Sequence, residues 1–386
     1  MDLDQSKNET FVDFVGGVQL LQGDGTRTAV PVLLIGLCVS GAAGNLLVML
    51  TFYRDFRHAR GSEVKALLAA VAAADLAILL LCAPVRVVTY YRRSWTLGGF
   101  ACSTADWFQH ACVVAKTLTL ATTSRAQHHA AAAAPGGGGP TWIHGALAFI
   151  WGVSATLPIP QFLFASLRPL GADTFVCVSE TPVCAAEAMG LFYKVYPALT
   201  FALPAAFTLA YHVKALHAAV NRGGPARAGT RRQSKVTLVL LCVSGANALL
   251  LLPEWSAFTW TRLGHSKPPA GLAVFAQVLV YAGSCAPPAI LMTMYDDVRR
   301  GVAALWFAAT CRGAGRAAVR GCPKSGENGA EAGAHVGAAA AGEASSQGEP
   351  QDKTFPDVEH FWTGRRNTHV EDDQDPVPWE REEKML

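Results

Sequence analysis

Two opposite charges interrupt long apolar segments of this sequence. Asp75 lies within the apolar run 66–85, and Lys116 lies within the run 107–124. A lone charge in hydrocarbon is costly, so such side chains usually face the interior of a helix bundle and pair with each other. At about 1.5 Å per residue, Lys116 lies roughly 21 Å along its helix from Cys102. By the same rise, Asp75 lies roughly 20 Å from the start of its own helix. These depths predict an ion pair between Asp75 and Lys116; the alternative is a neutral or differently paired lysine.

A second group of polar and aromatic side chains lies near the ends of the apolar runs. Asp106 and His110 are four residues apart, which places them on one face of a helix. Aromatic residues with a few polar groups are typical of a site for a peptide or small molecule between helices. The candidate ligand-binding residues are Arg86, Asp106, Trp107, His110, Lys194, Glu254, Trp255 and Gln277.

Each of these candidates has a structural alternative. Trp107 and Trp255 also fit the aromatic belt at a membrane interface. Arg86 and Lys194 also fit the role of long cations that extend to lipid headgroups. Glu254 is the strongest candidate, because its expected depth makes an unused carboxylate costly.

Motifs for catalysis or metal binding are missing from the sequence. His128-His129 does not provide the HExxH spacing, there is no GxxxxGK[ST] loop, and the ten cysteines form no CxxC pair. The two halves of the chain show no duplication of the kind common in transporters. We therefore expect no enzyme activity, no cofactor and no metal. The net charge of +3 is too small to indicate nucleic acid.

The elements that position these residues follow from composition. The chain has 386 residues, of which 51% are hydrophobic and only 16% charged, against about 25% charged in soluble domains. A bilayer core needs about 20 helical residues, and seven runs are long and apolar enough. Because they are continuously apolar rather than alternating, helices are favoured over a β-barrel. The seven runs are 28–53, 66–85, 107–124, 145–167, 195–211, 236–253 and 271–294.

Basic residues predict the orientation of these helices. Arginines and lysines concentrate after the first run, before the sixth and after the seventh, so these loops should be cytoplasmic. The N-terminal segment 1–27 should then be extracellular. It contains Asn8-Glu9-Thr10, a glycosylation acceptor that works only in the lumen, although such triplets also occur by chance.

We therefore predict an all-α integral membrane protein with a seven-helix bundle over 28–295. Residues 296–309 are amphipathic and should form a short eighth helix that contacts membrane lipid. Cys311 follows this helix and is a candidate for lipidation, with an unmodified thiol as the alternative. The tail 310–386 is rich in Ala, Gly, Ser and Glu and is predicted to be disordered.

Particular motifs resemble those of the rhodopsin-like (class A) G-protein-coupled receptors over residues 28–309. They are Gly44-Asn45, Ala74-Asp75-Leu76, the segment from Trp95 to Cys102, Trp151, Pro204 and Pro253. Segments 103–110, 252–255, 356–362 and 375–380 further resemble the orphan galanin-receptor-like members of that family. The resemblance implies a plasma-membrane receptor, neuronal by analogy, with an extracellular ligand for which a neuropeptide is the expected class.

The resemblance also implies particular pairings. Cys102 should form a disulfide with Cys177, for which Cys184 is the rival partner. In the family, the position of Asp75 helps to bind a sodium ion together with a hydroxyl at the position of Lys116. We hypothesise that the lysine replaces this sodium with a permanent salt bridge.

Residues that switch such receptors between states are largely replaced. The Asp-Arg-Tyr motif falls at 126–128, so Gln127 stands where arginine is expected, and Arg125 is out of register. Leu251 replaces a tryptophan, and Pro287-Pro288 replaces the Asn-Pro of the last helix. Coupling to a heterotrimeric G protein is therefore left open, and arrestin is a second possible partner. The alternative function is a signalling-deficient membrane scaffold that acts through its tail.

Overall fold

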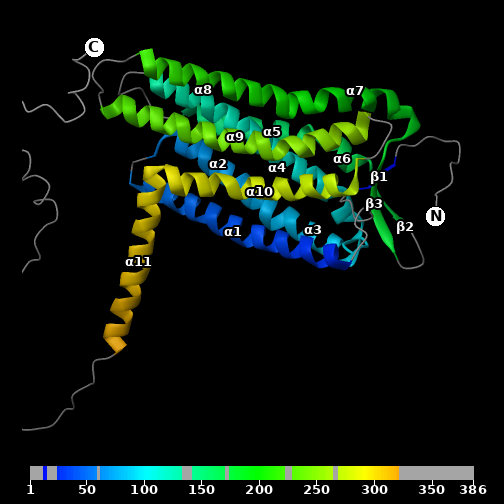
Figure 1. Cartoon of the computed structure of the whole chain (residues 1–386), viewed down its shortest axis with the longest axis horizontal. Coiled ribbons are helices and arrows are strands. Elements are labelled where there is room, and N and C mark those ends of the chain that lie inside the picture. Colours follow the sequence, from blue (N-terminus) through cyan, green and yellow to red (C-terminus); the bar gives the residue numbers. More distant parts are fainter. Residues whose placement is uncertain are drawn as a thin grey trace, which may run out of the picture. The chain divides into compact units, whose positions relative to one another are not determined.

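A computed structural model describes residues 12–14, 24–58, 61–132, 141–169, 174–221, 228–263 and 268–320. Its helices run side by side as rods, several of which bend or break along their length (Figure 1). In chain order, the elements that build the rods are α1 (Asp24–Arg57), α2 (Glu63–Ala77), η1 (Ile78–Cys82), α3 (Ala83–Arg92), α4 (Gly98–Ala132), α5 (Thr141–Thr156), α6 (Ile159–Leu163), η2 (Val183–Ala185), α7 (Ala186–Pro197), η3 (Ala198–Ala202), α8 (Leu203–Asn221), α9 (Ala228–Leu263) and α10 (Ala270–Met294).

Prolines account for the interruptions within the rods. The π-helical turns η1 and η3 end just before Pro84 and Pro204, whose rings cannot donate a helical hydrogen bond. The fourth rod along the chain consists of α5 and the short helix α6, and it breaks between them at Pro158. The predicted helix over 145–167 was therefore too long, because residues 165–167 lie in a strand instead.

The rod built by α4 differs from the others in its lower apolarity, and its middle residues are buried between other helices. By length and apolarity, six helical stretches of the described residues qualify as membrane spans, and α4 is not among them. Its residues 111–117 are all buried, and it packs against α2, α5, α8 and α9. Because protein rather than lipid surrounds this helix, its polar residues are tolerated.

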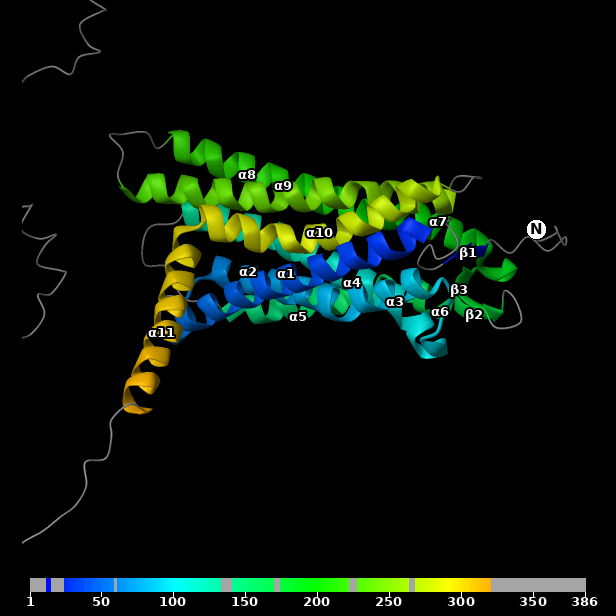
Figure 2. The ribbon, with the colours of Figure 1, turned by 60° about the horizontal axis from the view of Figure 1, so that its bottom comes forward.

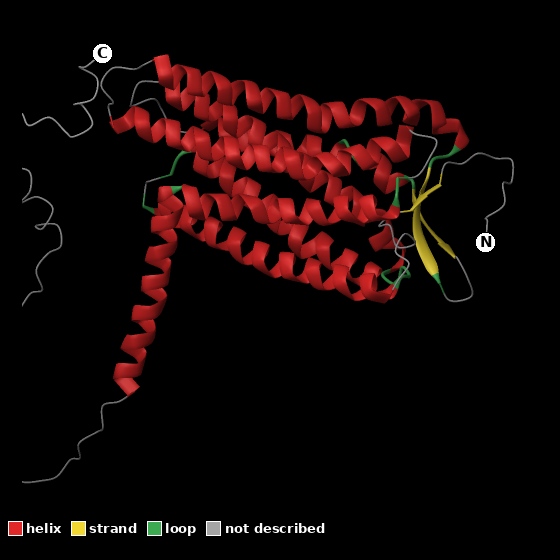
Figure 3. Cartoon of the chain, in the orientation of Figure 1, coloured by secondary structure: helices red, strands yellow, loops and turns green. Residues whose placement is uncertain are grey.

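A small antiparallel sheet lies at one end of the bundle, in yellow in Figure 3. It consists of β1 (Val12–Phe14), β2 (Ala165–Pro169) and β3 (Phe175–Glu180) in the order β1-β3-β2. Val12 pairs with Glu180, and Ala165 pairs with Ser179. The sequence did not predict this sheet, because its strands are short and β2 begins inside the apolar run 145–167 that predicted a helix. We call this end of the bundle the sheet end.

The last described helix, α11 (Asp296–Arg320), leaves the opposite end of the bundle (Figure 2). An extended residue, Tyr295 with φ −97° and ψ 105°, separates it from α10. Helix α11 runs to Arg320 and thus enters the segment 310–386 that we predicted to be disordered. Its Trp306 and Phe307 side chains are exposed. We call this end the α11 end.

Candidate functional site

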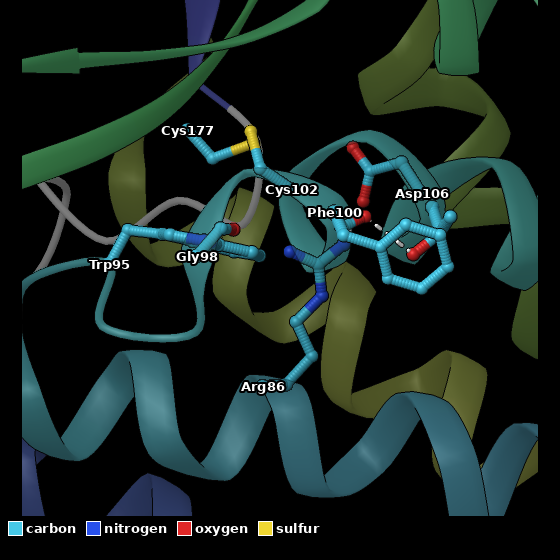
Figure 4. The surroundings of a disulfide bond; sticks show 8 residues. Arg86, Trp95, Gly98, Phe100, Cys102, Asp106 and Cys177 are labelled. Carbon is cyan, nitrogen blue, oxygen red and sulfur yellow. Dashed lines mark hydrogen bonds and ion pairs between the residues drawn. A yellow bond between two sulfur atoms is a disulfide. The ribbon is translucent and has the colours of Figure 1, made fainter.

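A disulfide between Cys102 and Cys177 joins the start of α4 to strand β3 at the sheet end. Trp95 supports this junction, because its indole Nε1 donates to the carbonyl of Gly98 at 2.9 Å and its backbone N donates to that of Phe175 at 2.7 Å (Figure 4). The rival partner Cys184 is an exposed free thiol. The disulfide therefore holds β3 beside the top of α4.

Gly98 begins α4 with a φ of +80°. Side chains other than glycine rarely adopt this conformation, so a substitution here would strain the turn that positions the disulfide.

Beneath the disulfide, Arg86 of α3 and Asp106 of α4 form an ion pair (Figure 4). The arginine side chain is buried, whereas the Asp106 side chain is partly exposed. Two of the predicted ligand-binding residues therefore neutralise each other and join α3 to α4.

His110 lies in an aromatic cluster built by α4, α7 and α9. Its ring centroid lies 5.9 Å from that of Tyr196, 5.8 Å from that of Trp255 and 5.6 Å from that of Phe258. The hydroxyl of Tyr196 also lies 3.4 Å from Nδ1 of His110. The sequence analysis missed Tyr196 and Phe258, although Phe258 follows Trp255 at helical spacing and so shares its face.

A narrow cavity borders this cluster. The residues that line it are Gln109, His110, Val113, Leu251, Glu254, Trp255 and Val280. Gln109 is held in place by Tyr281 of α10, whose hydroxyl donates to its Oε1 at 2.9 Å. The structure thus brings three predicted ligand residues together with Leu251, a predicted switch position, in one cavity wall.

The remaining ligand candidates lie elsewhere. Trp107 donates from Nε1 to the carbonyl of Ala155 at 2.9 Å, so it faces α5 rather than the cavity. Lys194 lies inside α7, not before the fifth rod as predicted, and its side chain is exposed. Gln277 is buried in α10 without lining this cavity. The rotation of the helices, which spacing alone does not define, accounts for Trp107 and Gln277, whereas Lys194 differs because α7 already begins at Ala186.

Asp75 and Lys116 meet in the interior of the bundle. Nζ of Lys116 lies 2.7 Å from Oδ1 of Asp75 and donates to the carbonyl of Gly283 at 2.8 Å. Both side chains are almost fully buried, with 0% and 3% exposed. The ammonium therefore joins α2, α4 and α10 in one contact.

Among the predicted switch positions, Gln127 forms a neutral contact near the α11 end. Nε2 of the buried Gln127 donates to Oγ1 of Thr237 at 3.2 Å and to Oε1 of Gln233 at 3.4 Å. This contact joins α4 to α9. Arg125, in contrast, is exposed.

The double proline of α10 is buried within a continuous helix. Pro288 packs closely on Gly44 of α1: a Cβ atom added to Gly44 would lie only 3.0 Å from the Cβ of Pro288. Pro287 is its buried neighbour. Asn8 lies outside the described residues, as does the side chain of Cys311.

A second cavity, of about 460 Å³, opens at the α11 end. It is walled by the start of α9 and by the junction of α10 with α11. Its lining residues are Lys235, Val236, Val239, Met294, Tyr295, Asp296, Asp297, Arg299 and Arg300. Hydrophobic side chains and charges of both signs therefore face one space.

The architecture is that of a membrane receptor. It combines helices long enough to span a membrane, a disulfide at the sheet end and a cavity toward each end of the bundle. The family profile described as 7 transmembrane receptor (rhodopsin family) matches residues 44–291. The chain therefore belongs to the rhodopsin family of seven-transmembrane receptors and is a multi-pass membrane protein. This is a family of receptors rather than of enzymes.

Particular relatives refine this assignment. The chain is 30% identical to G-protein coupled receptor 151 of Homo sapiens, over 98% of this chain and 96% of that protein. It is 32% identical to the Mus musculus G-protein coupled receptor 151 protein, over 97% and 94%. It is 24% identical to galanin receptor type 2 of Mus musculus, over 75% and 78%. None of these relatives supports the alternative of a signalling-deficient scaffold.

Proposed function

We propose that this receptor binds an extracellular peptide at the sheet end and transmits the binding to a heterotrimeric G protein at the α11 end. The observation that carries the proposal is the narrow cavity walled by α4, α9 and α10, whose lining includes Glu254 and the aromatic rings of His110 and Trp255. Galanin receptors among the relatives support a peptide, specifically a neuropeptide, as the ligand class. The proposed location is the plasma membrane of neurons, with the N-terminus outside.

The aromatic rings at the wall of the cavity favour a peptide that offers an aromatic side chain, for which the cavity of about 10 Å³ has to widen on binding. Stacked and edge-on contacts between aromatic rings are favourable, and the cluster offers several rings at the cavity wall. Arg86 and Asp106 lie beneath the disulfide, and their pairing neutralises both charges. The ligand is therefore expected to gain affinity mainly from apolar burial.

Transmission is proposed to involve the buried contacts that join the helices. Gln127 links α4 to α9 without a charge, so this contact between the two helices consists of neutral hydrogen bonds. Lys116 is proposed to take the place of a bound sodium ion, because its ammonium already neutralises the carboxylate of Asp75. Arrestin is proposed as a further partner of the same end.

Modifications and lipid contacts complete the proposal. Asn8 is the proposed glycosylation site and Cys311 the proposed lipidation site. The exposed Trp306 and Phe307 of α11 suit contact with membrane lipid.

The proposal is tested by screening a peptide library on cells that express the full chain, with G-protein activation and arrestin recruitment measured in parallel. We expect at least one peptide to produce a saturable, receptor-dependent response. If no peptide binds, while small molecules compete for the cavity, the ligand class is wrong. If a peptide binds without either response, the coupling half is wrong.

A further inference from the structure

Three charged side chains from three helices meet near the α11 end, beside the cavity of about 460 Å³ that Asp297 helps to line. Nζ of Lys65 in α2 lies 2.5 Å from Oδ2 of Asp55 in α1 and 3.2 Å from Oδ2 of Asp297 in α11. Residues 55, 65 and 297 are thus joined by one ammonium, although 232 positions (297 − 65) separate the last two.

Lys65 is the buried member of this group. Its side chain is 8% exposed, against 22% for Asp55 and 13% for Asp297. Asp297 also pairs with Arg300, but that arginine is 74% exposed and the pair lies within α11 itself. Exposed pairs of this kind contribute little, and this one cannot attach α11 to another helix. Lys65 is therefore a buried charge that connects α11 to the bundle.

Close packing between α11 and α1 accompanies the contact between Lys65 and Asp297. A Cβ added at Gly301 of α11 would lie 2.7 Å from Cγ2 of Thr51 in α1, so the two helices touch there. One turn earlier, Val298 is fully buried in the apolar cluster of the bundle. The first turns of α11 are thus seated on α1 by close packing beside the charge cluster.

Asp297 and Arg300 also line the cavity of about 460 Å³ at the α11 end. A residue outside that cavity can therefore determine where one of its walls stands. We propose that Lys65 is a positioning residue for signal transmission, which holds the first turns of α11 on α1 through Asp297 and so fixes the α11 wall of this cavity. The link to transmission rests on the proposed G-protein coupling; the seating of α11 does not.

The seating is tested by hydrogen exchange of the full chain in lipid nanodiscs, with two neighbouring substitutions compared. Asp297→Asn removes the contact with Lys65, whereas Asp296→Asn removes only the exposed pair with Arg299. Both remove one negative charge from the first turn of the same helix. We expect amide exchange over 298–308 to accelerate about tenfold in Asp297→Asn, as loss of a hydrogen bond between charged groups predicts, and to change less than about twofold in Asp296→Asn. Equal exchange in the two variants would overturn the proposal.

Substitution of the lysine itself gives the second measurement. Lys65→Met should accelerate exchange over 298–308, and Lys65→Arg should restore slow exchange because it keeps the charge. Both variants are then compared for G-protein activation at matched surface expression. Loss of activation in Lys65→Met with recovery in Lys65→Arg is expected. Faster exchange with unchanged activation would reject the role in transmission, and slow exchange in both Lys65→Met and Asp297→Asn would reject the seating role itself.

Discussion

A buried ammonium can take the place of a mobile ion. Lys116 contacts both Asp75 and the carbonyl of Gly283, so the negative charge that would attract a cation is already neutralised. Removing one partner of such a pair is strongly unfavourable, because it leaves the other charge buried alone.

The sodium hypothesis therefore predicts opposite salt responses for two proteins. The unaltered receptor should melt at the same temperature in NaCl and in KCl of equal ionic strength. Lys116→Ser frees the carboxylate of Asp75, so its melting temperature should be lower in KCl and rise by several degrees in NaCl. Thermal unfolding of the detergent-purified proteins measures both. Stabilisation of the unaltered receptor by sodium alone would contradict the hypothesis.

Trp255 and Trp107 were both predicted to bind the ligand, but only Trp255 lines the cavity, so their substitutions should affect ligand affinity differently. Trp255→Ala removes a cavity wall, whereas Trp107→Ala removes a ring that faces α5. Truncation of a buried aromatic contact commonly weakens binding by 2 kcal/mol or more, about thirtyfold. We expect this loss of affinity for the peptide found by the screen in Trp255→Ala, and a change below about threefold in Trp107→Ala. Competition binding on cells at matched expression measures both.

At the scale of elements, the contact between α4 and α9 is held by hydrogen bonds to Gln127. Each neutral hydrogen bond contributes about 1 kcal/mol, and a population shifts only by the difference that a contact makes between two states. The isosteric change Thr237→Val removes one partner of Gln127. It should raise agonist-independent G-protein activation by up to about fivefold.

A matched change on the same helix is the control. Thr261→Val removes a hydroxyl that bonds only the carbonyl of Ala257 within α9, so basal activation should stay unchanged. Activation of a panel of G proteins, normalised to surface expression, measures both variants. Equal basal activity in the two would show that the Gln127 contact does not restrain α9.

The junction of α4 with β3 depends on one of two nearby cysteines. Cys177→Ser removes the disulfide with Cys102, whereas Cys184→Ser removes an exposed free thiol. Loss of a disulfide typically costs about 2–4 kcal/mol, so Cys177→Ser should lower surface expression and melting temperature. Cys184→Ser should leave both near their original values. The reverse pattern would assign the pairing to Cys184.

At the scale of the whole molecule, the proposed orientation is open to a direct test. An epitope tag ahead of Met1 should bind antibody on intact cells, and a tag after Leu386 only after permeabilisation. Asn8→Gln should abolish the mobility shift that a glycosidase produces in the unaltered protein. A tag ahead of Met1 that is sealed inside the cell would invert the topology and exclude glycosylation at Asn8.

The sequence by itself determined the number of rods and the solvent around them. Lipid offers no partner to backbone groups, so each crossing must be a helix of about 20 apolar residues, and such runs are visible without any coordinates. The same cost of isolated charge predicted that Asp75 would find Lys116, and the two lie 2.7 Å apart. The disulfide partner of Cys102 came from family resemblance rather than from the residues alone.

Only the tertiary structure decided which of these residues share a space. Trp107 and Trp255 are equally plausible in sequence, but the rotation of their helices turns one toward α5 and the other into the cavity. Lys65 gave no signal of its own, because its partners lie in α1 and α11. Contacts between distant segments depend on the packing of whole helices, and the periodicity within one helix does not contain that information.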